Sequence, residues 1–221
     1  MSENAGSVRI TRLILVPLIM TLAITFLRLE GELHHWSSIL FARSAGGAGA
    51  IVGIAWLPFI FGPYFAAKLT AAGAGPSSSG KVILYAVIGL VVTMLAVASE
   101  SNPGALTGRA LAGILMIVAA GMIQFISWGT LARTLLAYGF GARVPVAIVM
   151  FYAIAGGWGT HYDALPPGYA GPTDFMGRYI AIGLVPQFIF WIAYTMIIGA
   201  LAAGVYLAIA RRGRGAVPQP A

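Results

Sequence analysis

Long apolar stretches separated by short polar segments dominate the chain. A helix needs roughly 20 predominantly apolar residues, within a range of about 17–25, to cross the hydrocarbon core of a bilayer. Six stretches reach or approach this length before charged, glycine or proline residues interrupt them. The six predicted spans are 12–33, 48–67, 82–98, 110–132, 144–159 and 179–210. This pattern predicts an all-α integral membrane protein, a bundle of about six transmembrane helices.

Two of these spans leave alternatives open. The fifth is short, and Gly156, Gly157 and Gly159 weaken its outer end, so it could instead be a re-entrant segment. The sixth is long enough to span with tilt, and Pro186 could break it. The connections between spans are short, which leaves no room for a separate soluble domain. We therefore expect one transmembrane domain over residues 1–215 and a short cytoplasmic tail at 216–221.

The composition agrees with a lipid environment. Hydrophobic residues make up 59% of the chain and charged residues 9%, against roughly 25% charged residues in soluble domains. The net charge of +7 would favour nucleic-acid binding in a soluble protein, but here the charges fall at the ends of the spans, so the expected partner is the bilayer and not nucleic acid. The absence of cysteine excludes disulfides, thiol catalysis and thiolate metal sites. The excess of arginine over lysine, with abundant alanine and glycine, is typical of a bacterial protein and predicts the cytoplasmic (inner) membrane.

The basic residues predict an orientation. If the six spans alternate in direction, one side of the membrane receives both termini and two connections, with nine basic residues. These are Arg9, Arg12, Lys68, Lys81, Arg133, Arg143, Arg211, Arg212 and Arg214. The other side receives four, which are Arg28, Arg43, Arg109 and Arg178. Cytoplasmic loops carry the excess of basic residues, so both termini are predicted to be cytoplasmic. Five of the six acids and all three histidines then lie outside, where we expect any chemical site to open.

A stripe of polar residues follows one face of the first span. Thr21, Thr25, Arg28, Glu32 and His35 are separated by steps of four, three, four and three, which is helical spacing. Arg28 and Glu32 are placed for an ion pair. Charges at membrane depth usually face the bundle interior or a cavity, so the stripe predicts a polar pocket entered from outside. The alternative is an arginine that extends to the membrane surface beside its partner.

Further polar and small residues inside the spans have two interpretations. Gln124 and Gln187 lie on the fourth and sixth spans, where they could line the pocket or form interhelical hydrogen bonds of roughly 0.6–2 kcal/mol. Gly46, Gly49 and Gly53 have the spacing that allows helices to approach closely. They predict a face for a second copy of the chain or for other membrane subunits.

A metal site is a further hypothesis. Its candidate ligands are Glu30, His34, His35, His161 and Asp163. Zinc accepts three or four nitrogen and oxygen ligands of these types. However, adjacent histidines point about 100° apart on a helix, so at most one of His34 and His35 would join, and no HExxH motif is present. The alternative is that these are interfacial residues, and apart from such a divalent metal no cofactor is predicted.

Three functions remain open. The sequence favours a small transporter, channel or solute-binding protein with a pocket opening to the extracytoplasmic side, for which a cavity should reach past Arg28 toward Thr21. A non-catalytic subunit of a membrane complex should instead form a solid bundle. A membrane-embedded enzyme should bring His161 or Asp163 within about 4 Å of Glu32 or His35. We expect binding rather than catalysis, since no P-loop, dinucleotide fingerprint or nucleophile motif is present.

Overall fold

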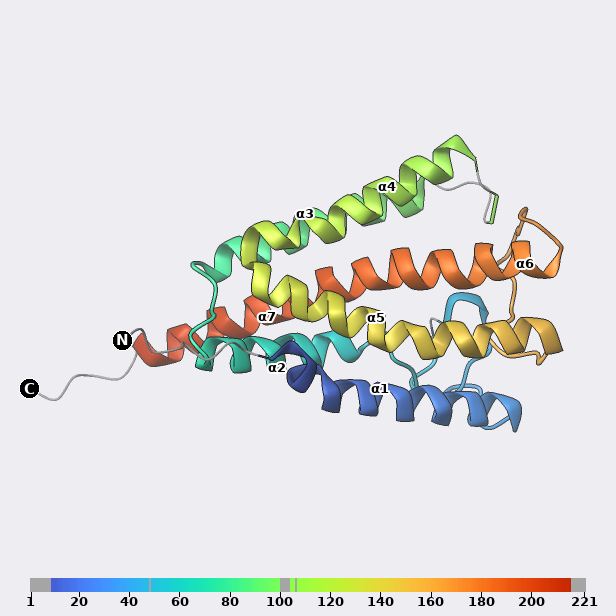
Figure 1. The fold of residues 1–221 in the computed structure, drawn as a ribbon, viewed down its shortest axis with the longest axis horizontal. Coiled ribbons are helices and arrows are strands. Elements are labelled where there is room, and N and C mark those ends of the chain that lie inside the picture. Colours follow the sequence, from blue (N-terminus) through green and yellow to red (C-terminus); the bar gives the residue numbers. More distant parts are fainter. Residues whose placement is uncertain (1–8, 48, 100–103, 106, 216–221) are drawn as a thin grey trace, which may run out of the picture.

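The computed structural model describes residues 9–47, 49–99, 104–105 and 107–215, with side chains to Ala210, and every regular element in these ranges is helical (Figure 1). The predicted tail at 216–221 lies outside the described residues. The elements are α1 (Ile10–Leu33), η1 (Ala45–Gly47), α2 (Leu57–Ala71), α3 (Ser79–Ala98), α4 (Gly108–Met122), α5 (Gln124–Gly156), α6 (Phe175–Arg178), η2 (Tyr179–Leu184), η3 (Pro186–Phe190) and α7 (Trp191–Gly215). The two elements η2 and η3 are π-helical and join α6 to α7.

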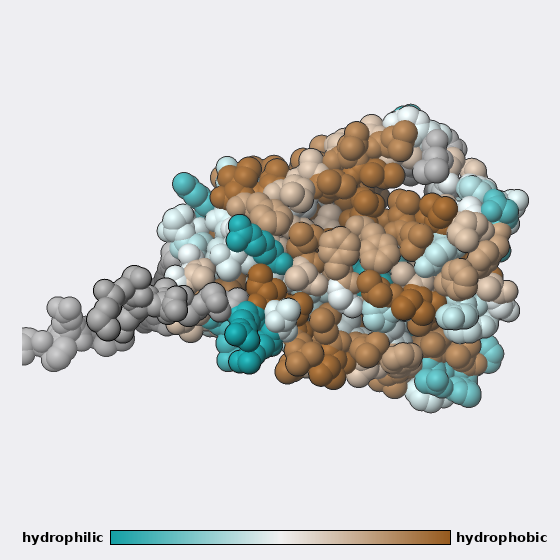
Figure 2. All heavy atoms as spheres, in the orientation of Figure 1, coloured by the Kyte–Doolittle hydropathy of each residue, from teal (hydrophilic) through white to brown (hydrophobic). Residues whose placement is uncertain are grey.

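The helices have the length and surface expected in a lipid bilayer. Four helical stretches are long and apolar enough to cross a membrane: α1, α3, α5 and the stretch Phe175–Ala210. Large apolar side chains point outward, including Leu15, Ile19 and Leu115, which are 55%, 58% and 69% exposed. Figure 2 shows hydrophobic residues across the middle of the visible face and hydrophilic ones toward its ends. These features are consistent with a helical membrane protein.

The last long helix lies at the centre of the bundle. Helix α7 packs against α2, α3, α4 and α5, whereas α1 lies at one edge and packs mainly on α5. Figure 1 shows that α1 begins and α7 ends at the same end of the molecule. The opposite end, called the loop end below, carries the α1–α2 connection and the connection between α5 and α6. The site described below lies beneath these two connections.

Helix α2 begins at Leu57 and not at residue 48, as the apolar pattern predicted. Pro58 occupies its first turn, where proline is favoured because the missing N–H would have no helical partner. The glycine-rich residues before it form no α-helix, and Gly46 and Gly49 have φ values of 76° and 91°. The prediction of a helix-packing face at Gly46, Gly49 and Gly53 is therefore wrong. Close helix approach occurs instead between α2 and α7, where a Cβ on Gly62 would collide with the carbonyl oxygen of Gly199.

The boundary predicted between the fourth and fifth spans is also wrong. A connection was expected over residues 133–143, but α5 continues through it to Gly156. The chain reverses earlier, near Trp128, whose φ of −159° and ψ of 83° leave the helical region (Figure 1). The Trp128 indole N–H donates to the carbonyl oxygen of Ala74 at 2.8 Å and holds this turn. Arg143 consequently lies within a helix. Eight basic residues, and not nine, then remain on the side of the membrane that was predicted to hold both termini.

Pro186 does not break the predicted sixth span. The helix remains continuous in direction but widens into π-helical turns over η2 and η3. Proline cannot donate the N–H that an α-helical turn needs at this position, and wide turns are one way to accommodate that loss. Such π-helical turns occur frequently at functional sites. Here they carry Gln187, which is 7% exposed, into the bundle.

Candidate functional site

A cavity of about 310 Å³ lies beneath the loop end, between α1, η1, α5, the π-helical turns and the start of α7. Its size is at the lower end of the roughly 300–1,000 Å³ typical of small-molecule sites. Most of its wall is apolar. The polar side chains in the wall are those of Thr25, Arg28, Arg143, His161, Tyr162, Gln187 and Trp191. Any chemistry in the cavity has to come from this small set.

Arg28 of α1 is buried and fully engaged. Only 5% of the residue is exposed, and its Nε donates to Glu32 Oε1 at 2.7 Å. Its Nη1 donates to the carbonyl oxygen of Gly47, and its Nη2 to that of Ala42, both at 3.0 Å. A buried ion pair is tolerated only when further hydrogen bonds satisfy its remaining polar groups. The expected ion pair is thus present, and the guanidinium does not extend to the surface.

Glycines allow the α1–α2 connection to close over Arg28. A Cβ on Gly53 would lie 2.9 Å from Arg28 Nη1, and a Cβ on Gly47 would lie 3.1 Å from His161 Cδ2. Gly47 also has a φ of 71°, a conformation that other residues rarely adopt. The backbone around Gly47 and Gly53 therefore packs directly against the buried Arg28 guanidinium; this segment is called the wrap below. In this arrangement the carbonyl oxygen of Gly47 is bonded to Arg28 and not to an α-helical turn of its own segment.

The connection after α5 places His161 against Glu32. The His161 backbone N–H donates to Glu32 Oε2 at 2.8 Å, and its Nδ1 lies 2.6 Å from Glu32 Oε1. Asp163 shapes this connection by accepting hydrogen bonds from the N–H groups of Gly159 and Thr160, at 2.9 and 2.7 Å. The next residue, Tyr162, donates to the carbonyl oxygen of Thr25 at 3.3 Å. One carboxylate, Glu32, thus binds both a cation of its own helix and a loop 129 residues away.

The surroundings of His161 favour its neutral form. Burial lowers the pKa of His161 below its ordinary value and the charge of Arg28 lowers it further, whereas the hydrogen bond to Glu32 and the charges of Glu32 and Asp163 oppose this shift in part. A carboxylate only accepts hydrogen bonds, so the hydrogen of the neutral ring lies on Nδ1. The Nε2 atom is then a free acceptor, and it has no hydrogen-bond partner in the described part of the chain. It belongs to a ring that lines the cavity.

Arg143 of α5 is the other buried cation in the wall, 4% exposed. Its Nη1 makes one long hydrogen bond, 3.4 Å to Gln187 Oε1, and its Cζ lies 4.7 Å from the centre of the Trp191 ring. Its Nε has no partner, and no acid forms an ion pair with it, within the ranges described. The sequence interpretation missed this residue by assigning it to a cytoplasmic connection. The available signal was the uncharged, proline-free segment 134–142, which continues a helix as readily as it forms a loop.

The other predicted pocket residues divide into two groups. Thr25 and Gln187 lie in the cavity wall. Thr21 is buried outside it, 2.8 Å from the hydroxyl of Tyr138, and links α1 to α5. Gln124 lies at the far end of α5 and donates to the carbonyl oxygen of Tyr85 at 3.1 Å, which links α5 to α3. The cavity therefore stops at Thr25 and does not reach Thr21.

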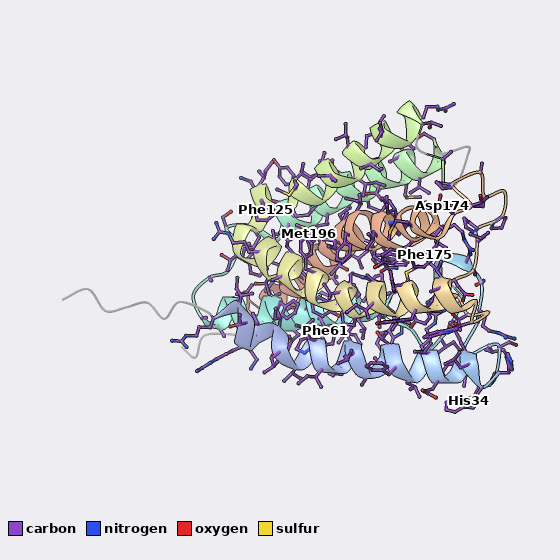
Figure 3. The ribbon with its side chains drawn as sticks, turned by 45° about the vertical axis from the view of Figure 1, so that its right-hand side comes forward. His34, Phe61, Phe125, Asp174, Phe175 and Met196 are labelled. Atoms are coloured by element: carbon purple, nitrogen blue, oxygen red, sulfur yellow. The ribbon has the colours of Figure 1, made fainter. Side chains whose placement is uncertain are left out.

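The five predicted metal ligands do not come together. His34 Nε2 lies 3.2 Å from Glu30 Oε2 on the exposed tip of α1 (Figure 3). His35 is exposed, with its Nδ1 2.6 Å from Arg43 Nη1. Asp163 holds the loop backbone, and His161 faces Glu32. No group of three or more His, Asp or Glu side chains that could hold a metal ion occurs among the residues whose positions are described.

Comparison with known proteins adds no functional assignment. No protein-family model, no curated protein and no solved structure matches the chain. Function is therefore inferred from the cavity and its buried charges.

Proposed function

We propose that this chain is a six-span protein of the bacterial inner membrane that binds a small solute in the cavity beneath its loop end. Helices α1, α3 and α5 run toward the loop end, and α2, α4 and α7 run back, which supports six passes (Figure 1). The basic residues still divide eight to four after Arg143 is removed from the count, which supports cytoplasmic termini and an extracytoplasmic loop end. The cavity would then be entered from outside the cytoplasm.

The observation that carries this proposal is the cavity itself. A purely structural subunit needs no cavity of about 310 Å³, and arginine and histidine side chains are costly to bury without polar partners. Small-molecule sites typically combine a mostly apolar wall with a few convergent polar groups, which is the composition found here. Solute binding, with or without transport, therefore accounts for the cavity better than the alternative of an accessory subunit whose helices form a solid bundle.

Cysteine labelling tests the orientation and the access to the cavity, since the chain has no cysteine of its own. Ala181→Cys places a thiol in the cavity wall, Ser38→Cys on the exposed loop end, and Ser77→Cys on the exposed α2–α3 connection at the other end. In intact cells, a small membrane-impermeant maleimide should label the first two variants and not the third.

A polymer-linked maleimide sharpens the same experiment. It should still label Ser38→Cys but be excluded from Ala181→Cys, because only small molecules would fit the cavity. Labelling of Ser77→Cys from outside would refute the orientation. An Ala181→Cys variant that stays unlabelled by the small reagent would refute the accessible cavity.

One observation favours a second candidate function, a membrane-embedded enzyme. Glu32 orients His161 through Nδ1 and leaves Nε2 free, which is how carboxylates orient histidine bases in several hydrolases. The polar wall residues include no serine, and the chain has no cysteine, so such a base would activate water. Once a solute is found, recovery of the solute unchanged would favour binding. Conversion that stops in His161→Asn while binding persists would favour catalysis.

A further inference from the structure

The charges in the cavity wall do not balance. Arg28 forms an ion pair with Glu32 at 2.7 Å, and His161 is hydrogen-bonded to the same carboxylate. Arg143 has no acidic partner, and no aspartate or glutamate lines the cavity among the described residues. Arg143 therefore brings to the cavity wall a positive charge that no acid among the described residues compensates.

The contacts of Arg143 within the protein do not offset its burial. An isolated buried ion costs several kcal/mol even after relaxation. The Trp191 ring offsets only part of this cost, and the hydrogen bond to Gln187 is long at 3.4 Å. Arg143 precedes the end of α5 at Gly156 by 13 residues, or about 20 Å of helix, which is too far for its side chain to reach the membrane surface.

Arg143 and Gln187 both line the cavity and retain donor groups of the kind that a carboxylate accepts from. Arg143 Nε has no hydrogen-bond partner among the described residues, and a guanidinium can bind a carboxylate through two parallel hydrogen bonds. Within the described residues, Gln187 Nε2 donates to the Met150 sulfur at 3.5 Å, a weak acceptor that an oxygen could replace. One positive charge and two donor groups suit a monoanion. A phosphate dianion would bring more charge and more oxygen atoms than this wall can satisfy.

The rest of the wall calls for an apolar body on the ligand. Val146, Met150 and Ile182 surround the space above Arg143. A second cavity of about 210 Å³, lined by alanine, glycine, valine and isoleucine, shares Gly104 and Ala181 with the first. A ligand with an apolar group could extend in that direction.

We infer that the cavity is a binding site for a small organic carboxylate with an apolar group, whose carboxylate pairs with Arg143 and Gln187. This assignment rests on the proposed function and specifies the class of solute. Arg143 binds the ligand directly, whereas Arg28, which Glu32 holds in place, is part of the cavity wall.

Binding of hexanoate to the purified full-length protein in detergent tests the assignment. Equilibrium dialysis with labelled hexanoate should show saturable binding, and the uncharged analogue hexanamide and inorganic phosphate should each compete at least about tenfold less well. Arg143→Met should weaken hexanoate binding at least about tenfold, and Gln187→Leu should weaken it by a smaller factor. Arg133→Met is the matched control, because Arg133 is exposed on the same helix, and it should bind like the unmodified chain.

The outcomes separate this inference from the proposed function. Unchanged hexanoate binding in Arg143→Met, or stronger competition by phosphate than by hexanoate, would overturn the carboxylate assignment. Absence of saturable hexanoate binding would also overturn it, and labelling of Ala181→Cys in intact cells would then show that solute access survives. If Ala181→Cys also stays unlabelled, both the accessible cavity and its carboxylate ligand are refuted.

Discussion

The two buried arginines of the cavity are almost equally exposed, but they differ in how many of their donor groups are hydrogen-bonded within the protein. Arg28, 5% exposed, donates three hydrogen bonds, one of them to a carboxylate. Arg143, 4% exposed, has one long hydrogen bond, an aromatic ring and an unpaired Nε. The difference separates two uses of the same side chain. Arg28 serves the fold, because each of its three nitrogen atoms donates a hydrogen bond to the protein. Arg143 instead retains donor capacity that the described residues do not use.

The largest effect is expected when Arg28 loses its counterion. Glu32→Ala leaves a buried guanidinium unpaired and also releases His161, so the free energy of unfolding should fall by about 3–5 kcal/mol. Equilibrium unfolding in mixed detergents measures this. Glu30→Ala on the same helix is the control, because Glu30 is exposed and should contribute less than about 1 kcal/mol. Equal effects of the two substitutions would refute the structural role of the Glu32 carboxylate.

Removal of the second arginine should act in the opposite direction. Arg143→Met replaces an uncompensated charge by an apolar side chain, so the free energy of unfolding should stay the same or rise by about 1–4 kcal/mol. Arg28→Met is the comparison, and it should destabilise the protein because Glu32 is then left unpaired. The same unfolding measurement applies. If both variants lose stability to a similar extent, the contrast between the two arginines does not hold.

A smaller effect should follow from crowding the wrap around Arg28. Gly47→Ala and Gly46→Ala both place a side chain at positive φ, which costs roughly 1–2 kcal/mol in each case. Only the new Cβ at position 47 meets the His161 ring and Arg28, since nothing lies within 4 Å of one at position 46. Gly47→Ala should therefore be less stable than Gly46→Ala by about 1 kcal/mol. Equal stabilities of the two variants would show that this contact imposes no constraint.

The smallest effect concerns pH. The pKa of His161 is lowered in the folded protein, so the unfolded chain takes up a proton first as the pH falls below about 6.5. The stability contributed by neutral His161 is thus complete above about pH 6.5 and is lost progressively below it, by at most about 1.4 kcal/mol per pH unit. The charged groups around the ring are Arg28, Glu32 and Asp163.

Unfolding of the unmodified chain and of His161→Asn at several pH values measures this contribution. The difference in unfolding free energy between the two should shrink as the pH falls through this window. A difference that stays constant with pH would contradict the assignment of a neutral, buried His161.

The sequence predicted the features that depend on local spacing. The α1 stripe was recognisable because Thr21, Thr25, Arg28 and Glu32 follow the helical period, and all four are buried. The turn at Trp128 was not recognisable, since its hydrogen bond reaches Ala74, a residue 54 positions away. Arg143 was misplaced because a basic residue in an apolar chain normally marks the end of a span. The spacing of Gly46, Gly49 and Gly53 suggested helix packing, but the backbone of this segment is bonded to Arg28 instead.

The central position of α7 has a consequence for biogenesis. Chains emerge from the ribosome from the N-terminus onward, and earlier segments fold first where they can. Here the helix that contacts α2, α3, α4 and α5 is made after all four of them. These helices therefore lack their shared packing surface until α7 has been synthesised. Truncation before Trp191 would remove that surface.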